Sequence, residues 1–223
     1  HTLTYTSSNY FIALTDDIEL TIEGKGKIES VKYAASIFSV RNATLIINSG
    51  DFVAKENNSK TSLIAIDATE QANVIINGGS FYSKEVCVGM FKNTNLKING
   101  GTFTSLDNFV IGTNGSTGNR DNVITINGGV FNANIQSNGY IACGVYLANA
   151  DTLTINGGIF NINNGCGILV RSGNATIGND VEINLNIDGT VLSGKVGDSN
   201  INVDINASIV MDERSGYPGG APS

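Results

Sequence analysis

The stretch Ile76-Asn77-Gly78-Gly79-Ser80-Phe81 occurs five times in this chain with small changes. The other copies are Ile47-Asn48-Ser49-Gly50-Asp51-Phe52, Ile98-Asn99-Gly100-Gly101-Thr102-Phe103, Ile126-Asn127-Gly128-Gly129-Val130-Phe131 and Ile155-Asn156-Gly157-Gly158-Ile159-Phe160. The asparagines of successive copies are 29, 22, 28 and 29 residues apart. A repeat of this length is typical of a solenoid, in which each copy forms one turn and packs on the next.

An alternating stretch precedes each asparagine. Its first and third residues are aliphatic in every copy and its middle residue varies, as in Leu45-Ile46-Ile47, Val74-Ile75-Ile76, Leu96-Lys97-Ile98, Ile124-Thr125-Ile126 and Leu153-Thr154-Ile155. This pattern predicts a strand with one buried face. We expect the Asn-Gly-Gly segment to turn a corner, because Gly accepts positive φ and Asn tolerates it better than most residues. The Phe then returns to the interior and starts a second strand.

A third strand is expected after a variable loop in each repeat. These strands are Leu63–Asp67, Val86–Phe91, Phe109–Gly112, Ala142–Leu147 and Gly167–Val170. Three short strands and three corners per repeat predict an all-β fold, a single-stranded right-handed parallel β-helix of about seven to eight turns with a spacing of about 4.8 Å.

This fold predicts two ladders of identical side chains. One is an interior aromatic column formed by Phe52, Phe81, Phe103, Phe131 and Phe160. The other lines a corner, with each amide bonded to the next turn, and is formed by Asn48, Asn77, Asn99, Asn127 and Asn156. We interpret both sets as architectural.

Degraded copies of the repeat indicate where the ladder ends. The stretch 20–28 has Glu for the Asn and Ile for the Phe, and 175–181 is a degraded last copy. Terminal repeats are atypical because they cover the open ends of the core. We therefore expect residues 1–19 to form an N-terminal cap or lead-in, residues 20–209 the β-helix, and residues 210–223 a C-terminal linker or tail. Because there is no initiator Met, the chain is expected to be a processed piece of a longer protein.

Composition excludes several classes of partner and cofactor. The net charge of −7 argues against nucleic acid and anionic membrane surfaces. No apolar stretch reaches the roughly 18–20 residues that a membrane span needs. The only His is His1, and no CxxC occurs, so we expect no metal site and no cofactor.

Three aromatic residues fall on outward-facing positions of the expected strands, namely Tyr82, Phe91 and Tyr146. Exposed aromatics can stack on sugar rings or pack against a partner subunit. Two loops add candidate contacts for glycan or protein: one carries Arg120 and Asp121, and the other ends at Tyr140. The alternative interpretation, ordinary solvated loops, stays open.

The cysteines are too few and scattered for a disulfide framework. Cys143 and Cys166 precede Val145 and Ile168 by two residues, so we expect both to face inward in adjacent turns. Cys87 is expected to face the other way.

An enzyme would need a different pattern. A glycosidase uses two carboxylates about 5–9.5 Å apart, whereas the outward positions that flank the repeated Phe carry a single acid, Asp51. Loop carboxylates such as Asp107 and Asp121 could still meet in space. Enzymatic activity therefore stays open, although the sequence favours a non-enzymatic role.

From about Ile18 to Ile209, the repeats resemble those of the pectate-lyase-like superfamily of right-handed parallel β-helices. The Ile-Asn-Gly-Gly-x-Phe motif is similar to repeats in bacterial surface proteins and in bacteriophage tail spikes, fibres and capsid decorations. The family's catalytic acids and bases have no matching motif here, so no catalytic residue is carried over.

Low charge and an uninterrupted ladder favour a non-enzymatic structural or attachment module of an extracellular or virion assembly. The resemblance makes a phage fibre, spike or capsid-decoration component the specific expectation. Protein partners are expected within the assembly, with a homotrimer as one arrangement and a cell-surface glycan as a further partner. The alternatives are a polysaccharide-binding or polysaccharide-degrading domain, either lyase or hydrolase, and a bacterial surface adhesin.

Overall fold

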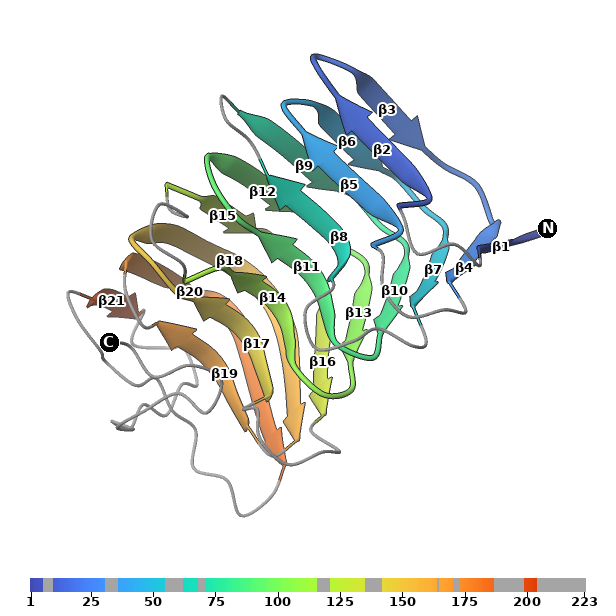
Figure 1. The fold of residues 1–223 in the computed structure, drawn as a ribbon. Coiled ribbons are helices and arrows are strands. Elements are labelled where there is room, and N and C mark those ends of the chain that lie inside the picture. The colour runs from blue at the N-terminus through green and yellow to red at the C-terminus, as the bar shows by residue number, and fades with distance from the viewer. Residues whose placement is uncertain are drawn as a thin grey trace.

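The chain is a parallel β-solenoid in a computed structural model (Figure 1). The structure describes residues 1–5, 10–30, 36–54, 62–67, 71–115, 121–134, 142–163, 165–170, 173–186 and 199–203. All regular secondary structure within these ranges is β-strand. Over the described residues the solenoid has about six turns, close to the predicted seven to eight, and the expected all-β parallel architecture is confirmed.

Each turn contains three short strands, and equivalent strands of successive turns pair in parallel. The strands before the Asn corner are β3 (Glu19–Ile22), β6 (Thr44–Ile47), β9 (Ala72–Ile76), β12 (Thr94–Ile98) and β15 (Val123–Ile126). The strands in register with the Phe strands are β1 (Thr2–Tyr5), β4 (Lys27–Ser30), β7 (Asp51–Ala54), β10 (Ser80–Ser83), β13 (Thr102–Ser105) and β16 (Val130–Asn134). The third strands are β2 (Ile12–Thr15), β5 (Phe38–Arg41), β8 (Ser62–Asp67), β11 (Val86–Met90), β14 (Phe109–Thr113), β17 (Ala142–Leu147) and β19 (Gly165–Val170).

Two long strands join the first two sets into one sheet. β18 (Asp151–Asn163) and β20 (Gly173–Asn186) continue through the Asn-Gly corner, and β21 (Ser199–Val203) pairs with β20. The result is a 14-stranded sheet and a separate 7-stranded sheet. Strand pairing begins at Thr2, inside the segment expected as a lead-in, because β1 pairs with β4 and β2 with β5. The proposed boundaries at 19 and 209 stay predictions.

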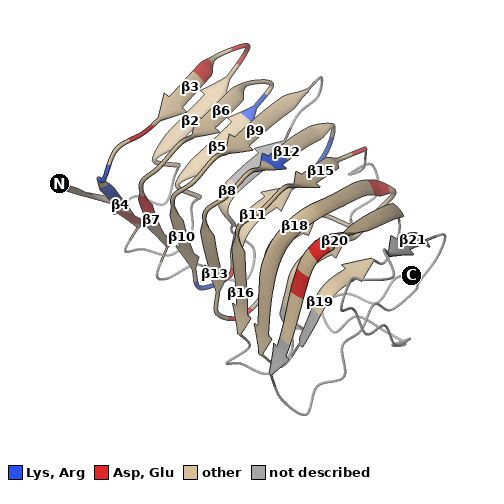
Figure 2. Ribbon diagram, turned by 180° about the vertical axis from the view of Figure 1, so that it is seen from behind, with Lys and Arg blue, Asp and Glu red and all other residues tan. Residues whose placement is uncertain are grey.

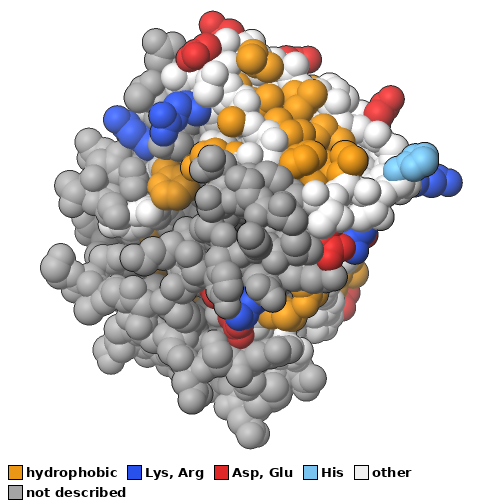
Figure 3. Space-filling view, turned by 45° about the vertical axis from the view of Figure 1, so that its right-hand side comes forward, with side chains coloured by type: hydrophobic (Ala, Val, Ile, Leu, Met, Phe, Trp, Pro, Cys, Tyr) orange, Lys and Arg blue, Asp and Glu red, His pale blue; other side chains and the backbone are white. Residues whose placement is uncertain are grey.

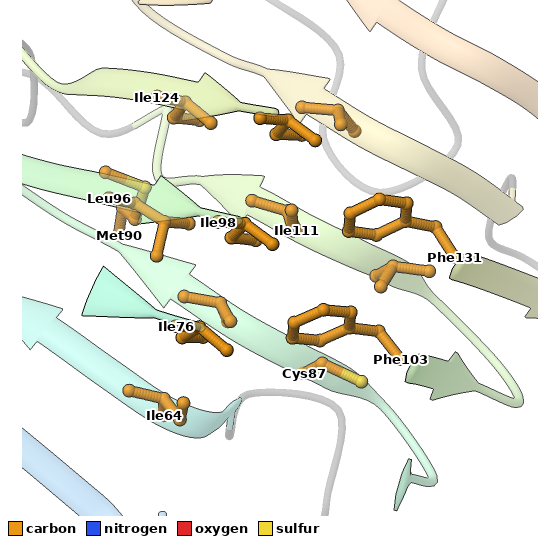
Figure 4. Packing of buried hydrophobic residues seen from close by; sticks show 14 of the residues in the cluster. Ile64, Ile76, Cys87, Met90, Leu96, Ile98, Phe103, Ile111, Ile124 and Phe131 are labelled. Atoms are coloured by element: carbon orange, nitrogen blue, oxygen red, sulfur yellow. The ribbon is translucent and has the colours of Figure 1, made fainter. Parts of the chain in front are cut away.

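The five repeated phenylalanines form one interior column, two of which Figure 4 shows above one another among aliphatic side chains. Successive ring centroids lie 5.1, 4.6, 5.1 and 4.6 Å apart from Phe52 to Phe160, with interplanar angles of 18° or less. All five rings are at most 1% exposed. Phe38, which the repeat did not predict, meets the Phe52 ring edge-on from β5 of the smaller sheet, with 5.4 Å between the ring centroids.

The two positions of the Gly-Gly corner need glycine for different reasons. Only the second has positive φ, between 110° and 132° in the five copies, so it alone needs left-handed freedom. The repeat asparagines do not have positive φ, contrary to expectation. A Cβ on the first glycine would instead meet the Asn carbonyl oxygen of the preceding turn, at 2.9 Å for Gly78 and 3.0 Å for Gly100. Close stacking of the turns therefore disfavours a side chain at Gly78 and Gly100, although the first copy carries Ser49 at this position.

The corner asparagines form a continuous amide ladder. The Nδ2 of each residue donates to the Oδ1 of its counterpart one turn nearer the N-terminus, at 2.8 Å from Asn77 to Asn48, 2.7 Å from Asn99 to Asn77, and 2.8 Å in the next two steps. The ladder lies on the surface. It fixes the register of the turns at the corner where the interior columns begin.

Tyr146 and Cys143 lie in a small apolar cluster outside the main core, together with Ala148, Leu169 and Phe109. Tyr146 does point out of the main core, but it is 4% exposed and stacks on Phe109 at 4.6 Å, so the expectation of an exposed aromatic is wrong.

Cys143 does not face inward as expected. A Cβ on Gly144 would meet the Phe160 ring, so residue 144 takes the inward position. Cys87, expected to face the other way, lies in the main core. The reason is that the smaller sheet contains two consecutive core residues per turn, such as Cys87 and Val88. This break in the alternation shifts the pattern by one residue.

Candidate binding surface

The outer face of the Phe strands carries aligned side chains at the position before and at the position after each Phe, and the second of these files contains the hydrogen-bonded amides. After Phe52 this place holds Val53, which is buried. In the following turns it holds the outward residues Tyr82, Thr104, Asn132 and Asn161, and then Asn184, which follows Ile183 rather than a Phe. The first four are half-buried and Asn184 is exposed. We call these five residues the outer-face column. Seen from behind, the sheets in this region carry few charged residues (Figure 2).

Hydrogen bonds connect most of this column. Asn132 donates to the Thr104 hydroxyl at 3.3 Å, Asn161 to Asn132 at 2.9 Å, and Asn184 to Asn161 at 3.0 Å. Asn184 also donates to the Glu182 carboxylate at 2.7 Å. These bonds hold the amides in one orientation along the solenoid axis, so the column is ordered before any ligand arrives.

The chemistry of the column suits a neutral, hydroxyl-rich ligand. A carboxamide has two N–H donors and a carbonyl oxygen with two lone pairs. Each bond along the column uses one donor of one amide and one lone pair of the next, so hydrogen-bonding capacity remains at the surface. The aromatic ring of Tyr82 adds a face on which a sugar could stack. The spacing of about 4.8 Å between turns is close to the length of one sugar unit in an extended glycan.

A buried polar cluster lies where two of these strands end. β10 and β13 are followed by short corners that contain Glu85, Asp107 and Asn108, which are 7%, 8% and 4% exposed. Asn108 donates to the Glu85 carboxylate at 3.2 Å. Burial raises the pKa of Glu85, the bond from Asn108 partly offsets this, and the nearby Asp107 raises the pKa further. Asp107, expected as a loop carboxylate, thus lies near a second acid that the sequence did not single out.

Buried serine hydroxyls form hydrogen bonds with the backbone of these short corners. The Ser83 hydroxyl accepts from the Glu85 backbone N–H at 3.2 Å, and the Ser105 hydroxyl lies within hydrogen-bond distance of the carbonyl oxygens of Glu85 and Asn108, between which its one O–H is shared. Both serines are fully buried, and Ala54 and Ala133 take the same place in neighbouring turns. The cluster is therefore well explained by the architecture of the corner.

A second buried carboxyl belongs to a network that crosses three turns. Asp151 accepts from the backbone N–H and the amide of Asn122 at 3.0 and 2.9 Å, and Asn122 accepts from the Thr94 hydroxyl at 2.7 Å. Asp151 is fully buried, and this burial raises its pKa, while hydrogen bonds from Thr113, Asn122 and Asn149 act in the opposite direction. The hydrogen bonds of both carboxyl oxygens of Asp151 go to neighbouring protein groups. We therefore interpret this carboxyl as structural.

The residues singled out from the sequence do not form one site. Tyr82 lies on the outer face of β10, Phe91 is half-buried just after β11, and Tyr146 belongs to the cluster on β17. Asp121 is exposed, with φ of 66°, two residues before β15 begins. Arg120 and Tyr140 lie outside the described residues. Of these candidates, only Tyr82 belongs to the outer-face column.

The amides of the outer-face column are the functional candidates that sequence reasoning missed. The available signal was their constant position, one residue after the repeated Phe. That position carries no acid in any of the five copies, and its polar side chains bond to each other only between turns.

Within the described ranges, no group of three or more His, Cys, Asp or Glu side chains is placed to hold a metal ion. None of the described segments is a helix long and apolar enough to cross a membrane. No family model, no curated protein and no solved structure matches this chain.

Proposed function

We propose that this chain is a rigid structural or attachment module on the exterior of a cell or virion. The observation that carries the proposal is the continuous stack of Phe52, Phe81, Phe103, Phe131 and Phe160, flanked by the amide ladder at the corner. Each turn contacts its neighbours through both side-chain ladders and backbone pairing. Such a stack resists bending and local opening, which suits a spacer or stalk.

The repeat motif supports a more specific form of this proposal. Its resemblance to repeats of bacteriophage spikes, fibres and capsid decorations, and to the wider pectate-lyase-like β-helices, makes a virion component the preferred assignment. A bacterial surface adhesin would use the same rigid, stacked solenoid, and this is the nearest alternative.

Localisation tests this proposal directly. Antibodies against the chain should label the exterior of the particles or cells that contain it, as seen by immunogold electron microscopy on intact samples. Labelling confined to the interior of permeabilised cells would contradict it. A panel of polysaccharides incubated with the chain should release no reducing sugar, and clear turnover would replace the structural assignment with an enzymatic one.

A second candidate function is binding of a neutral polysaccharide, and the outer-face column is the observation that favours it. Glycan arrays followed by calorimetry would measure this binding. Replacing Tyr82 and Asn161 together by Ala should remove it, because the first change takes away the stacking ring and the second interrupts the bonded amides. The matched control is Thr154→Ala on the outer face of the strand set before the corner, which should bind like the wild type.

If turnover did appear, the acid pair would be tested next. Glu85→Gln and Asp107→Asn keep the size of each side chain and remove its charge. Loss of turnover in both variants, with wild-type thermal stability, would assign the chemistry to that corner.

A further inference from the structure

Four of the five corner asparagines are followed directly by glycine, in Asn77-Gly78, Asn99-Gly100, Asn127-Gly128 and Asn156-Gly157. This dipeptide is prone to deamidation, in which the backbone nitrogen of the glycine attacks the carboxamide carbon of the asparagine. Glycine favours the attack because no Cβ shields its nitrogen and its backbone rotates freely. All four asparagines are exposed, so the water that the reaction consumes can reach them.

Three of these corners also leave the attacking nitrogen without a protein partner. Within the described residues, no group accepts a hydrogen bond from the backbone N–H of Gly78, Gly100 or Gly128. These glycines lie between strands. Gly157 differs, because it lies inside β18 and pairs with Asp180 of β20. The first three corners are therefore the reactive ones by geometry.

The amide ladder opposes the reaction at each of these corners. Asn99, for example, donates to Asn77 at 2.7 Å and accepts from Asn127 at 2.8 Å. Hydrogen bonds of a carboxamide lie near its plane, whereas a nucleophile approaches its carbon from above that plane. The side chain must therefore turn out of the ladder and lose both bonds before it can react, so the reactive rotamer is rarely populated.

We propose that Asn77, Asn99 and Asn127 are deamidation sites that the ladder protects, and that deamidation of one site releases the next site toward the N-terminus. The glycine N–H first gives its proton to a hydroxide ion of the solvent. Its nitrogen then bonds to Cγ of the asparagine, and the Nδ2 group takes up a proton and leaves as ammonia. Water opens the resulting succinimide ring, which leaves a carboxylate in the form of aspartate or isoaspartate.

The direction follows from the polarity of the ladder bonds. Each asparagine donates through Nδ2 to the preceding turn and accepts through Oδ1 from the following turn. An aspartate at position 99 cannot donate to Asn77, and its oxygen then faces the Asn77 Oδ1. It still accepts from Asn127, and this bond becomes charge-assisted and stronger. Asn77 is thus released, whereas Asn127 is held more firmly.

Each conversion also adds a negative charge to the surface. The chain already has a net charge of −7, and charged side chains lie scattered among uncharged and hydrophobic ones on the described surface in Figure 3. Carboxylates in adjacent turns, about 4.8 Å apart, repel one another. Repulsion loosens the corner further, and the added charge lets ion exchange separate molecules by the number of sites that have reacted.

Asn99→Asp tests the direction, because it places the reaction product at the central site. The folded chain is incubated at mildly alkaline pH, and peptide mass spectrometry follows deamidation at Asn77 and Asn127. Asn77 should react roughly 2- to 10-fold faster than in the wild type, the factor that corresponds to one neutral hydrogen bond, and Asn127 no faster. The matched control is Asn99→Ala, which removes the bonds to both neighbours and should accelerate both sites.

The wild type provides a test that needs no folded variant. Its three sites should react faster in guanidinium chloride than in the native chain, and native molecules modified only at Asn99, isolated by ion exchange, should next react at Asn77. Circular dichroism should show both variants folded, since Asn99 is exposed. Equal rates in the native and unfolded wild type overturn the protection. Equal acceleration of Asn77 and Asn127 by Asn99→Asp, or acceleration of Asn127 alone, overturns the direction.

Discussion

Replacing Phe103 by Ala tests the stacked interior most directly, because this ring lies in the middle of the aromatic column. Phe103 is fully buried, and its centroid lies 4.6 Å from that of Phe81 and 5.1 Å from that of Phe131. The change removes the ring and leaves a space between two others. Each neighbouring ring is held by its own strand, so the space can close only slightly.

The magnitude follows from this geometry. Truncation of a buried Phe to Ala costs about 3–5 kcal/mol, and the cost rises when the site cannot collapse. We therefore expect the upper half of that range, about 4–5 kcal/mol, with the lost ring contacts of about 0.5–1.5 kcal/mol per pair included. For a chain of this size the melting temperature should fall by about 2–4 °C per kcal/mol, which gives roughly 8–20 °C.

Urea unfolding followed by far-ultraviolet circular dichroism measures the loss, since the chain has no Trp to report by fluorescence. The matched control is Thr102→Ala, one residue away on the exposed side of the same strand, which should stay within about 0.5 kcal/mol of the wild type. A loss below about 1 kcal/mol for Phe103→Ala would show that the rings do not form a packed interior column.

Three further predictions concern the polar ladder, a buried carboxyl and a buried thiol. Asn99→Ala removes two hydrogen bonds of the amide ladder, and Asn156→Ala removes one. At about 0.5–1.5 kcal/mol per bond, Asn99→Ala should lower the free energy of unfolding about twice as much as Asn156→Ala. Equal losses for the two variants in urea titrations would contradict the ladder. The pKa of Asp151 is higher in the folded chain than in the unfolded chain, where it is about 3.9. The protonated carboxyl therefore stabilises the fold fully at pH values below about 3.9. This contribution is lost as the pH rises through the pKa that Asp151 has in the folded chain. Asp151→Asn should therefore gain stability relative to the wild type between pH 3.5 and pH 8, and a constant difference would exclude a raised pKa. Burial raises the pKa of Cys87 to about 12, so iodoacetamide at pH 8 should modify this thiol only after unfolding, as peptide mass spectrometry would show; rapid labelling of the native chain would refute its burial.

Much of the fold could be predicted from the sequence because its signals are local and repeated. Aliphatic residues alternate with variable residues before every asparagine, and one Phe follows at a constant distance. Each copy therefore indicates the same set of inward-facing and outward-facing positions. The third strands were predicted to within two residues at each boundary, as with Val86–Phe91 against the observed Val86–Met90. The strands that bury one face follow the period of two, which is visible in a single turn.

The prediction failed where that period is interrupted. Two consecutive core residues in the smaller sheet, such as Cys87 and Val88, move the positions before the pair to the other face. This displaced Cys143 from its expected inward position. The burial of Tyr146 also depends on a neighbour in an adjacent turn, Phe109, whose position the sequence of one turn does not reveal.

The sequence by itself determined the repeat, the inward Phe and the Asn-Gly corner, because each depends on the order of residues within one turn. The tertiary structure decided which residues of different turns meet. It paired Asn132 with Asn161, placed Asp151 against Asn122, and required glycine at position 78 through the carbonyl oxygen of Asn48. The steps between copies are unequal, so such contacts arise only once the strands align and the loops absorb the differences in length.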